Sequence, residues 1–300
     1  MSSAVASAAE RVPAPASAAD RFEAAWRTHR NERLRRSALG LGLLVLAFAW
    51  SAHVAEVSPA KLYAGLPRIG EYVERTMPVL RLGHLPEDLA EWFWDLGGWL
   101  ALLGETLVMA YLATLLGTLG ALAGCFLAAR GLSPHPAVAW MVRRFFEFCR
   151  AVPDLVFALL FIYAFGLGPM AGVMAVAIHS LGASGKLFAD AAEAALPGPI
   201  EGLRAAGAGW LATMRFGVLP QVLPNFASFT LWRFEINVRS SAIIGFVGAG
   251  GIGEALFTAV RLLHYEDVSA LLILLVLTVS LIDQGCAVVR HRLIGTGAAR

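Results

Sequence analysis

The sequence predicts an all-α integral membrane protein with about six transmembrane helices, and two observations carry this prediction. Hydrophobic residues make up 58% of the 300 residues, charged residues only 15%, and the mean hydropathy is +0.65. Soluble domains, in contrast, carry about 25% charged residues. Six stretches are also long and apolar enough for the helix of roughly 20 residues that crosses a hydrocarbon core. The chain is therefore expected to fold in lipid.

The apolar stretches are expected to form helices at residues 38–55, 99–129, 137–166, 169–191, 222–247 and 268–289. The second is long enough to tilt or to protrude from the bilayer. The third includes the run RRFFEFCRAVPD, in which Pro153 is expected to break or kink the helix, because proline lacks the N–H group that a helix interior needs.

The first 37 residues are expected to be a disordered, basic cytoplasmic segment. Residues 1–20 are mostly Ala, Ser and Pro and have little to bury. The first apolar run begins only at Ala38, so no cleaved signal peptide is expected. Residues 56–98 are expected to form a periplasmic loop, and residues 293–300 a cytoplasmic tail.

The distribution of lysine and arginine predicts the orientation, because cytoplasmic loops retain positive charge. If both termini lie in the cytoplasm, the connections on that side hold fourteen Lys and Arg residues, and the outer connections hold five. We therefore expect a multi-pass protein with cytoplasmic N- and C-termini, and a cytoplasmic loop at about 192–220.

That loop reads EAALPGPIEGLRAAGAGWLATMRFGVLP. A turn is expected at Pro197-Gly198-Pro199, with Pro199 at the first position of a helix. Glu201 then falls in the first turn, where the helix dipole favours an acid, and Gly207 is expected to end the helix. A helix of about two turns is not stable alone, so something else should pack on it.

The same loop resembles the coupling segment of ABC importer permeases. The family signature is E-A-A, three residues, G, nine residues and I-x-L-P. This chain keeps its spacing: Glu201 to Gly207 is followed by nine residues and then by Gly217-Val-Leu-Pro. Gly202 stands in place of the first Ala, and Gly217 in place of Ile. In that family the segment is a coupling helix that docks in a groove of a cytoplasmic ATPase. The resemblance implies ATPase coupling for Glu201, Gly202, Leu203, Arg204, Ala205, Ala206, Gly207, Leu219 and Pro220.

Two longer runs, residues 150–193 and 233–253, are similar to permeases of phosphonate importers, and the likeness covers about 99–292. It implies a type I ABC importer permease domain over 99–292 in the bacterial inner membrane, an ATPase partner and a periplasmic phosphonate-binding protein. Transporters of phosphite and related oxyanions share this branch, so the ligand stays open. A second copy of the permease is expected, because a chain with one coupling helix serves one of two ATPase subunits.

The run FVGAGGIG has the G-x-G-x-x-G spacing of dinucleotide-binding loops. Only 47 residues follow Gly253, too few for the rest of a doubly wound sheet. We expect instead an irregular end of the fifth span with a packing or gating role. Contact of its N–H groups with an anion is the alternative. The candidate gate residues are Gly248, Gly250, Gly251 and Gly253.

Three charged residues, Arg233, Glu235 and Arg239, fall within the fifth span, where a charge is costly unless it is paired or hydrated. Glu235 and Arg239 are four residues apart, so an ion pair between them is expected, with Arg233 beside Asn237 on a neighbouring face. The alternative is a cationic lining for an anion. Ser240 completes the candidate path residues.

Other functions lack their motifs. The sequence has no H-E-x-x-H, G-x-S-x-G or G-x-x-x-x-G-K-[ST], so no catalytic residue, metal site or cofactor is expected, and ATP hydrolysis is expected in a separate subunit. The net charge of +2 does not indicate a nucleic-acid partner. The remaining alternative is a secondary transporter or channel for a small anion, although the two halves show no internal repeat.

Overall fold

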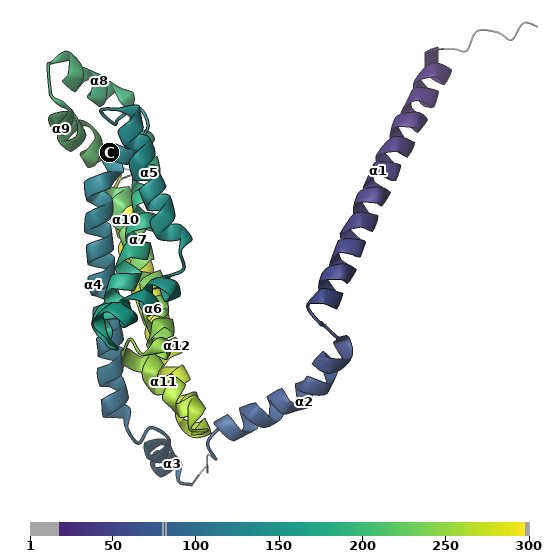
Figure 1. The fold of residues 1–300 in the computed structure, drawn as a ribbon, viewed down its shortest axis with the longest axis vertical. Helices are drawn as coiled ribbons and strands as arrows, with labels where there is room; N and C mark the ends of the chain where they lie inside the picture. Colours follow the sequence, from purple (N-terminus) through teal and green to yellow (C-terminus); the bar gives the residue numbers. More distant parts are fainter. Residues whose placement is uncertain (1–17, 80, 82, 298–300) are drawn as a thin grey trace, which may run out of the picture. The chain divides into compact units, whose positions relative to one another are not determined.

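The computed structural model describes residues 18–79, 81 and 83–297, and these residues form helices joined by turns (Figure 1). The all-α prediction is confirmed. Contacts divide the chain into two units, Met1–Glu71 and Tyr72–Arg300.

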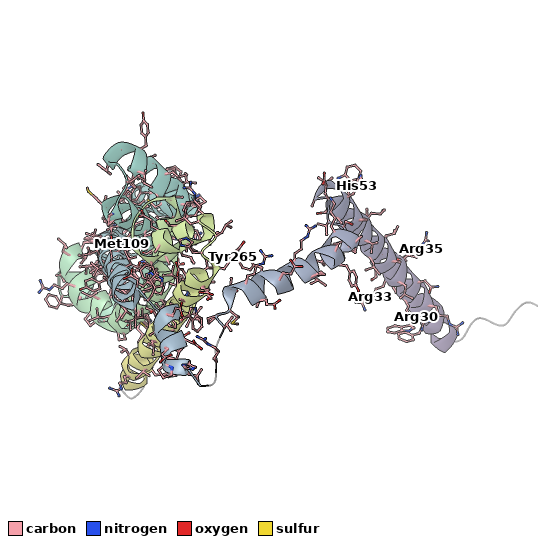
Figure 2. The ribbon with its side chains drawn as sticks, turned by 90° about the horizontal axis from the view of Figure 1, so that it is seen from below. Arg30, Arg33, Arg35, His53, Met109 and Tyr265 are labelled. Atoms are coloured by element: carbon pink, nitrogen blue, oxygen red, sulfur yellow. The ribbon has the colours of Figure 1, made fainter. Side chains whose placement is uncertain are left out.

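The first unit contains the long helix α1 (Ala18–Val54), of which His29–Val54 is long and apolar enough to cross a membrane. The expected disorder is wrong for residues 18–37, which are helical; residues 1–17 lie outside the described residues. The basic run consists largely of good helix formers, so it extends the helix of the adjoining apolar stretch. Arg30, Arg33 and Arg35 lie on this basic part (Figure 2).

The expected loop at 56–98 contains two helices, α2 (Pro59–Thr76) and α3 (Leu85–Trp92). No residue of α2 is buried. Before α3, a guanidinium nitrogen of Arg81 lies 2.7 Å from Asp88 Oδ1 and holds the pKa of this carboxyl below its ordinary value. Trp92 at the end of α3 donates from Nε1 to Ser269 Oγ at 3.0 Å, which ties α3 to the last helix.

The second unit is a bundle in which α4 (Leu96–Ala128) and α7 (Pro169–Glu193) pack along each other, with α10 (Leu219–Ile244) against both and α12 (Tyr265–Gly297) against α10. Across the described residues, four helices are long and apolar enough to span a membrane, or up to six if two bent pairs each count as one span. This agrees with the prediction of about six.

One bent pair is α5 (Pro136–Ala151) and α6 (Asp154–Phe165), which meet at 86°. The break falls at Val152 and Pro153, as the sequence predicts, because Val152 is extended before the proline. The other pair joins Trp210–Val247 to α11 (Gly251–Arg261) at 46°.

Small residues of α7 allow its neighbours to approach its backbone closely. A Cβ atom at Gly182 would lie 2.5 Å from Phe146 O and 2.7 Å from Arg150 N of α5, and one at Gly185 would lie 2.6 Å from the Phe146 ring. Membrane helices associate through such packing, since lipid supplies no hydrophobic force between them.

We therefore expect Gly182→Ala to lower the free energy of unfolding by about 1–3 kcal/mol, because the added methyl group meets backbone atoms that cannot move aside. Unfolding of the purified protein in detergent measures the effect. Gly104→Ala in α4 is the control, since no atom lies within 4 Å of its added Cβ. Equal stability of the two variants would contradict the packing argument.

Candidate functional site

The predicted coupling helix is present as α8 (Pro197–Ala205), but it begins two residues earlier than expected. The expected start at Pro199 and the placement of Glu201 in the first turn are therefore wrong. Both prolines fit within the first turn, because the first four N–H groups of a helix have no intrahelical partner. The expected end is confirmed: the last helical residue is Ala205, and Gly207 follows with φ 81°.

Two internal contacts hold α8 on the bundle. Ile200 is buried, and Leu203 packs toward Gly217, where an added Cβ would lie 3.0 Å from Leu203 Cδ1. Gly217 belongs to the π-helical turn η1 (Thr213–Val218), which leads into α10. The side chain of Gln221 bonds to both backbone groups of Leu196, at 2.9 Å to the N–H and 3.4 Å to the carbonyl.

The opposite side of α8 is open to solvent at one end of the bundle (Figure 1). Among the motif residues, Glu201, Gly202, Arg204 and Ala205 of α8 are exposed, as are Ala206 and Gly207 directly after it. Leu219 is half-buried in the core and Pro220 is exposed in the first turn of α10. Two large apolar side chains that the motif did not indicate, Leu211 and Phe216, are 76% and 64% exposed. Their place in a loop between spans is the signal that could have found them.

A buried polar network joins α4, α7 and α10. Arg233 donates from Nε to Ser180 Oγ at 3.1 Å, and the Ser180 hydroxyl donates to Asn237 Oδ1 at 3.0 Å. Asn237 in turn donates from Nδ2 to Thr114 Oγ1 at 2.8 Å. All four side chains are at least nine-tenths buried. Arg233 does stand beside Asn237, as expected, and Ser180 of α7 joins them.

The expected ion pair between Glu235 and Arg239 does not form. A guanidinium nitrogen of Arg290 lies 2.6 Å from Glu235 Oε1, and one of Arg239 lies 3.1 Å from Asp283. Both partners, Arg290 and Asp283, belong to α12. This helix packs against α10 and places a residue of opposite charge next to each of Glu235 and Arg239. Ser240 is half-buried on the same helix.

The glycine run forms the bend between α10 and α11. After the 3-10 turn η2 (Gly245–Val247), Gly248, Gly250 and Gly251 have φ values of 91°, 85° and 72°, in the region that favours glycine. A Cβ at Gly253 would overlap Ala242 O. The irregular end of span five is thus present, whereas the short helix α11 after it was not expected.

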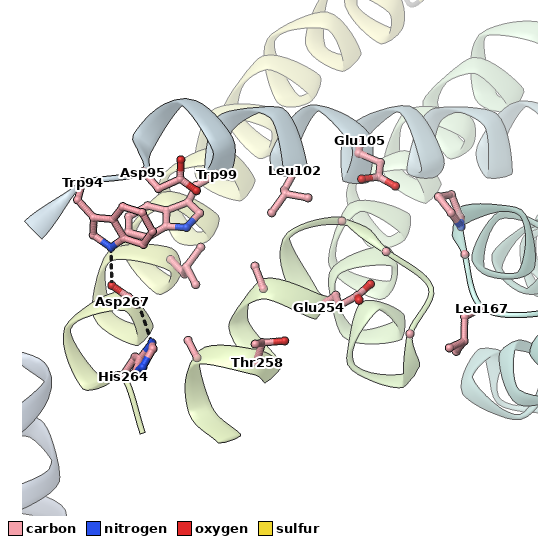
Figure 3. Close-up of a pocket in the computed structure, with 18 residues that line it drawn as sticks. Trp94, Asp95, Trp99, Leu102, Glu105, Leu167, Glu254, Thr258, His264 and Asp267 are labelled. Atoms are coloured by element: carbon pink, nitrogen blue, oxygen red, sulfur yellow. Dashed lines mark hydrogen bonds and ion pairs between the residues drawn. The ribbon is translucent and has the colours of Figure 1, made fainter. Parts of the chain in front are cut away.

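A cavity of about 640 Å³ lies beside the glycine run (Figure 3). Glu105 of α4 and Glu254 of α11 lie on its wall, and neither forms a hydrogen bond or ion pair with the residues that the structure describes. At its other end, Asp267 accepts from Trp94 Nε1 at 3.0 Å and lies 3.4 Å from His264 Nδ1. These carboxylates repel anions, so the cavity does not favour anion binding by the glycine N–H groups.

The fold is that of ABC importer permeases. The chain is similar to the MetNI methionine ABC transporter in an inward-facing conformation, with a TM-score of 0.57 and 20% identity over 65% of this chain and 95% of that one. It is also similar to a bacterial ABC transporter that imports the acidic polysaccharide alginate, with a TM-score of 0.58 and 12% identity over 88% and 99% of the two chains.

Residues 118–283 match the family described as "Binding-protein-dependent transport system inner membrane component", and the chain belongs to this family. It is 35% identical to the phosphite transport system permease protein PtxC of Stutzerimonas stutzeri, over 86% of this chain and 88% of that one. It is 42% identical to the phosphate-import permease protein PhnE of Mycolicibacterium smegmatis over 63% of this chain, but spans only 36% of that relative. A cryptic phosphonate transport permease of Escherichia coli, PhnE2, is 49% identical over 37% of this chain and 91% of its own length. The chain is thus a multi-pass permease of the inner membrane.

Proposed function

We propose that this chain is the membrane permease of an ATP-driven importer for phosphonate or a related phosphorus oxyanion such as phosphite. The observation that carries the proposal is the similarity to PtxC, which extends over more than four-fifths of both chains. The names of the relatives concern phosphate, phosphite and phosphonate, which share a phosphorus centre with anionic oxygens. ATP is hydrolysed in a separate cytoplasmic subunit, and a periplasmic binding protein delivers the anion.

The exposed side of α8 is the proposed docking surface for the ATPase, which puts α8 and both termini in the cytoplasm. Two features support this role. The side is polar or small, at Glu201, Arg204 and Ala205, while Ile200 anchors the helix beneath it. The segment also continues through the π-helical turn η1 into α10, so a displacement of α8 by the ATPase is transmitted to a membrane helix.

Uptake by the reconstituted permease tests the proposal against a secondary transporter or channel for a small anion. We expect proteoliposomes with the permease, its ATPase and its binding protein to accumulate phosphite or methylphosphonate only when ATP and the binding protein are present. Uptake driven by an ion gradient without ATP would favour the alternative, and the same vesicles with a catalytically inactive ATPase are the control.

The permease is proposed to work as a homodimer, because a pair of ATPase subunits needs two docking helices and a two-fold axis supplies both. Native mass measurement of the purified complex should find two copies of this chain with two ATPase subunits. One copy paired with a different permease chain would contradict this prediction.

A further inference from the structure

We propose that Arg233 and the break between α5 and α6 form a mid-membrane site that contacts the transported phosphorus oxyanion. The inference rests on the proposed function and adds to it a binding position and the residues that build it. Two independent observations lead to it: a buried arginine whose charge is not paired, and an interrupted helix beside that arginine.

The site lies near the middle of the spans that build it. Thr114 lies near the centre of α4, Ser180 near the centre of α7, and Arg233 just past the centre of α10. At this depth a charge is costly and is retained mainly where it serves a path or a partner. The Arg233 guanidinium is held by its bond to Ser180 of α7. The Ser180 hydroxyl is in turn bonded to Asn237, and Asn237 to Thr114 of α4.

Only one end of the Arg233 guanidinium is used by these bonds. Its Nε donates to Ser180, whereas its two terminal nitrogens form no hydrogen bond or ion pair with the described residues. Among the described residues, the side-chain polar atoms that are fully buried and have no hydrogen-bond partner are the hydroxyls of Thr118, Ser184 and Ser241. The terminal nitrogens of Arg233 do not belong to this group. The terminal nitrogens therefore reach the surface of the chain, with four N–H groups free to bind oxygen atoms.

The interrupted helix supplies the second observation. His179, next to Ser180 on α7, bonds through Nδ1 to the carbonyl of Val152, at 3.2 Å. Since a carbonyl only accepts, Nδ1 carries the hydrogen. Pro153 is exposed, and Asp154, the first residue of α6, interacts electrostatically with both Arg233 and His179. α6 also packs against α10, so the break lies beside the helix that carries Arg233.

Neither feature is suited to lipid. Irregular backbone at membrane depth is tolerated where it is buried in protein or lines an aqueous cavity, and a guanidinium facing hydrocarbon is strongly unfavourable. This surface must therefore face water or the partner copy along the translocation path. The two free terminal nitrogens of a planar guanidinium match the spacing of two oxygens of a phosphorus oxyanion, which it binds in bidentate fashion. The bond to Ser180 presents those nitrogens without reorganisation.

The competing explanation is that Arg233 serves only to neutralise Asp154, and a double variant separates the two. In the reconstituted importer, with radiolabelled phosphite as the probe, we expect Arg233→Gln to lower uptake by about tenfold or more and Arg233→Lys to recover part of it. Arg233→Gln with Asp154→Asn should transport as poorly as Arg233→Gln alone. ATPase stimulation by the binding protein should stay within about twofold of wild type, since coupling is intact. Full uptake by Arg233→Gln, or recovery in the double variant, would overturn the inference.

The pairing of Arg239 with Asp283 takes Arg239 out of the candidate path. Arg239→Gln with Asp283→Asn is therefore the matched control, because it also removes an arginine of α10 and leaves no unpaired charge. Its uptake should remain near that of wild type. A loss equal to that of Arg233→Gln would mean that any change of charge in α10 impairs transport, and it would count against a specific site.

A labelling experiment keeps the inference testable if a variant fails to fold or if the proposed substrate is wrong. Ala151→Cys places a thiol at the exposed end of α5, while the three native cysteines are buried and serve as the background. An anionic, membrane-impermeant methanethiosulfonate should modify this cysteine in the assembled complex, and phosphite should slow the reaction. No modification would refute a water-lined break. Absence of ATP-driven phosphite uptake in the wild type, with modification intact, would refute the proposed function alone.

Discussion

Replacing Arg290 by Gln is expected to lower the free energy of unfolding of the bundle by roughly 3 kcal/mol, because it leaves the carboxylate of Glu235 buried without a partner. The Glu235 side chain is only 8% exposed, and its nearest cation is the Arg290 guanidinium at 2.6 Å. Removing one member of such a pair costs more than the pair itself contributes, since an uncompensated charge remains in a medium that solvates it poorly.

The double variant Glu235→Gln with Arg290→Gln should recover most of this loss, because no unpaired charge remains. Unfolding in detergent of the two single variants, the double variant and wild type completes the cycle. Glu235→Gln with Arg239→Gln is the informative control, because it removes two charges that the structure does not pair and should show no recovery. If that combination recovered stability and the Arg290 combination did not, the pairing across α10 and α12 would be wrong.

Replacing Gly207 by Val is expected to lower ATP-driven uptake by about tenfold or more while the permease still inserts and folds. The residue has φ 81°, a conformation that a β-branched side chain adopts only at a cost of roughly 1–3 kcal/mol. No atom lies within 4 Å of an added Cβ there, so the effect is a local change of backbone direction at the end of α8 rather than a clash. The ATPase docking surface is then misplaced.

Co-purification of the ATPase with the permease, normalised to the amount of permease in the membrane, measures this uncoupling. Glu201→Lys should reduce co-purification by another route, since it reverses a charge on the exposed side of α8 without altering its fold. Gly209→Ala is the control, because Gly209 has φ −67° and space for a methyl group. Normal ATPase binding and uptake in both Gly207→Val and Glu201→Lys would remove α8 from the coupling role.

The features that depend on local composition could be predicted from the sequence. Apolar runs of sufficient length indicate the spans, because lipid requires each backbone polar group to be satisfied within a helix. Pro153 indicates the break in the third span, and Gly207 the end of the coupling helix, because each residue constrains its own backbone. The run Pro197-Gly198-Pro199 predicted the start of α8 two residues too late, and the motif from Glu201 to Pro220 indicated the coupling segment, since both are properties of one continuous stretch of chain.

Which charges meet depends on how the helices pack and could not be predicted from the sequence. The spacing along α10 predicts an ion pair between Glu235 and Arg239, yet each of them pairs with a residue of α12. A residue of another helix can approach more closely than a neighbour four positions along the same helix. The same holds for Arg233, whose bond to Ser180 joins residues 53 positions apart. The adjacent residue of α7, His179, bonds to the carbonyl of Val152, and this contact places the α5–α6 break beside α7. A sequence pattern records periodicity within one helix, whereas the faces that two helices present to each other are set by the packing of small residues such as Gly182.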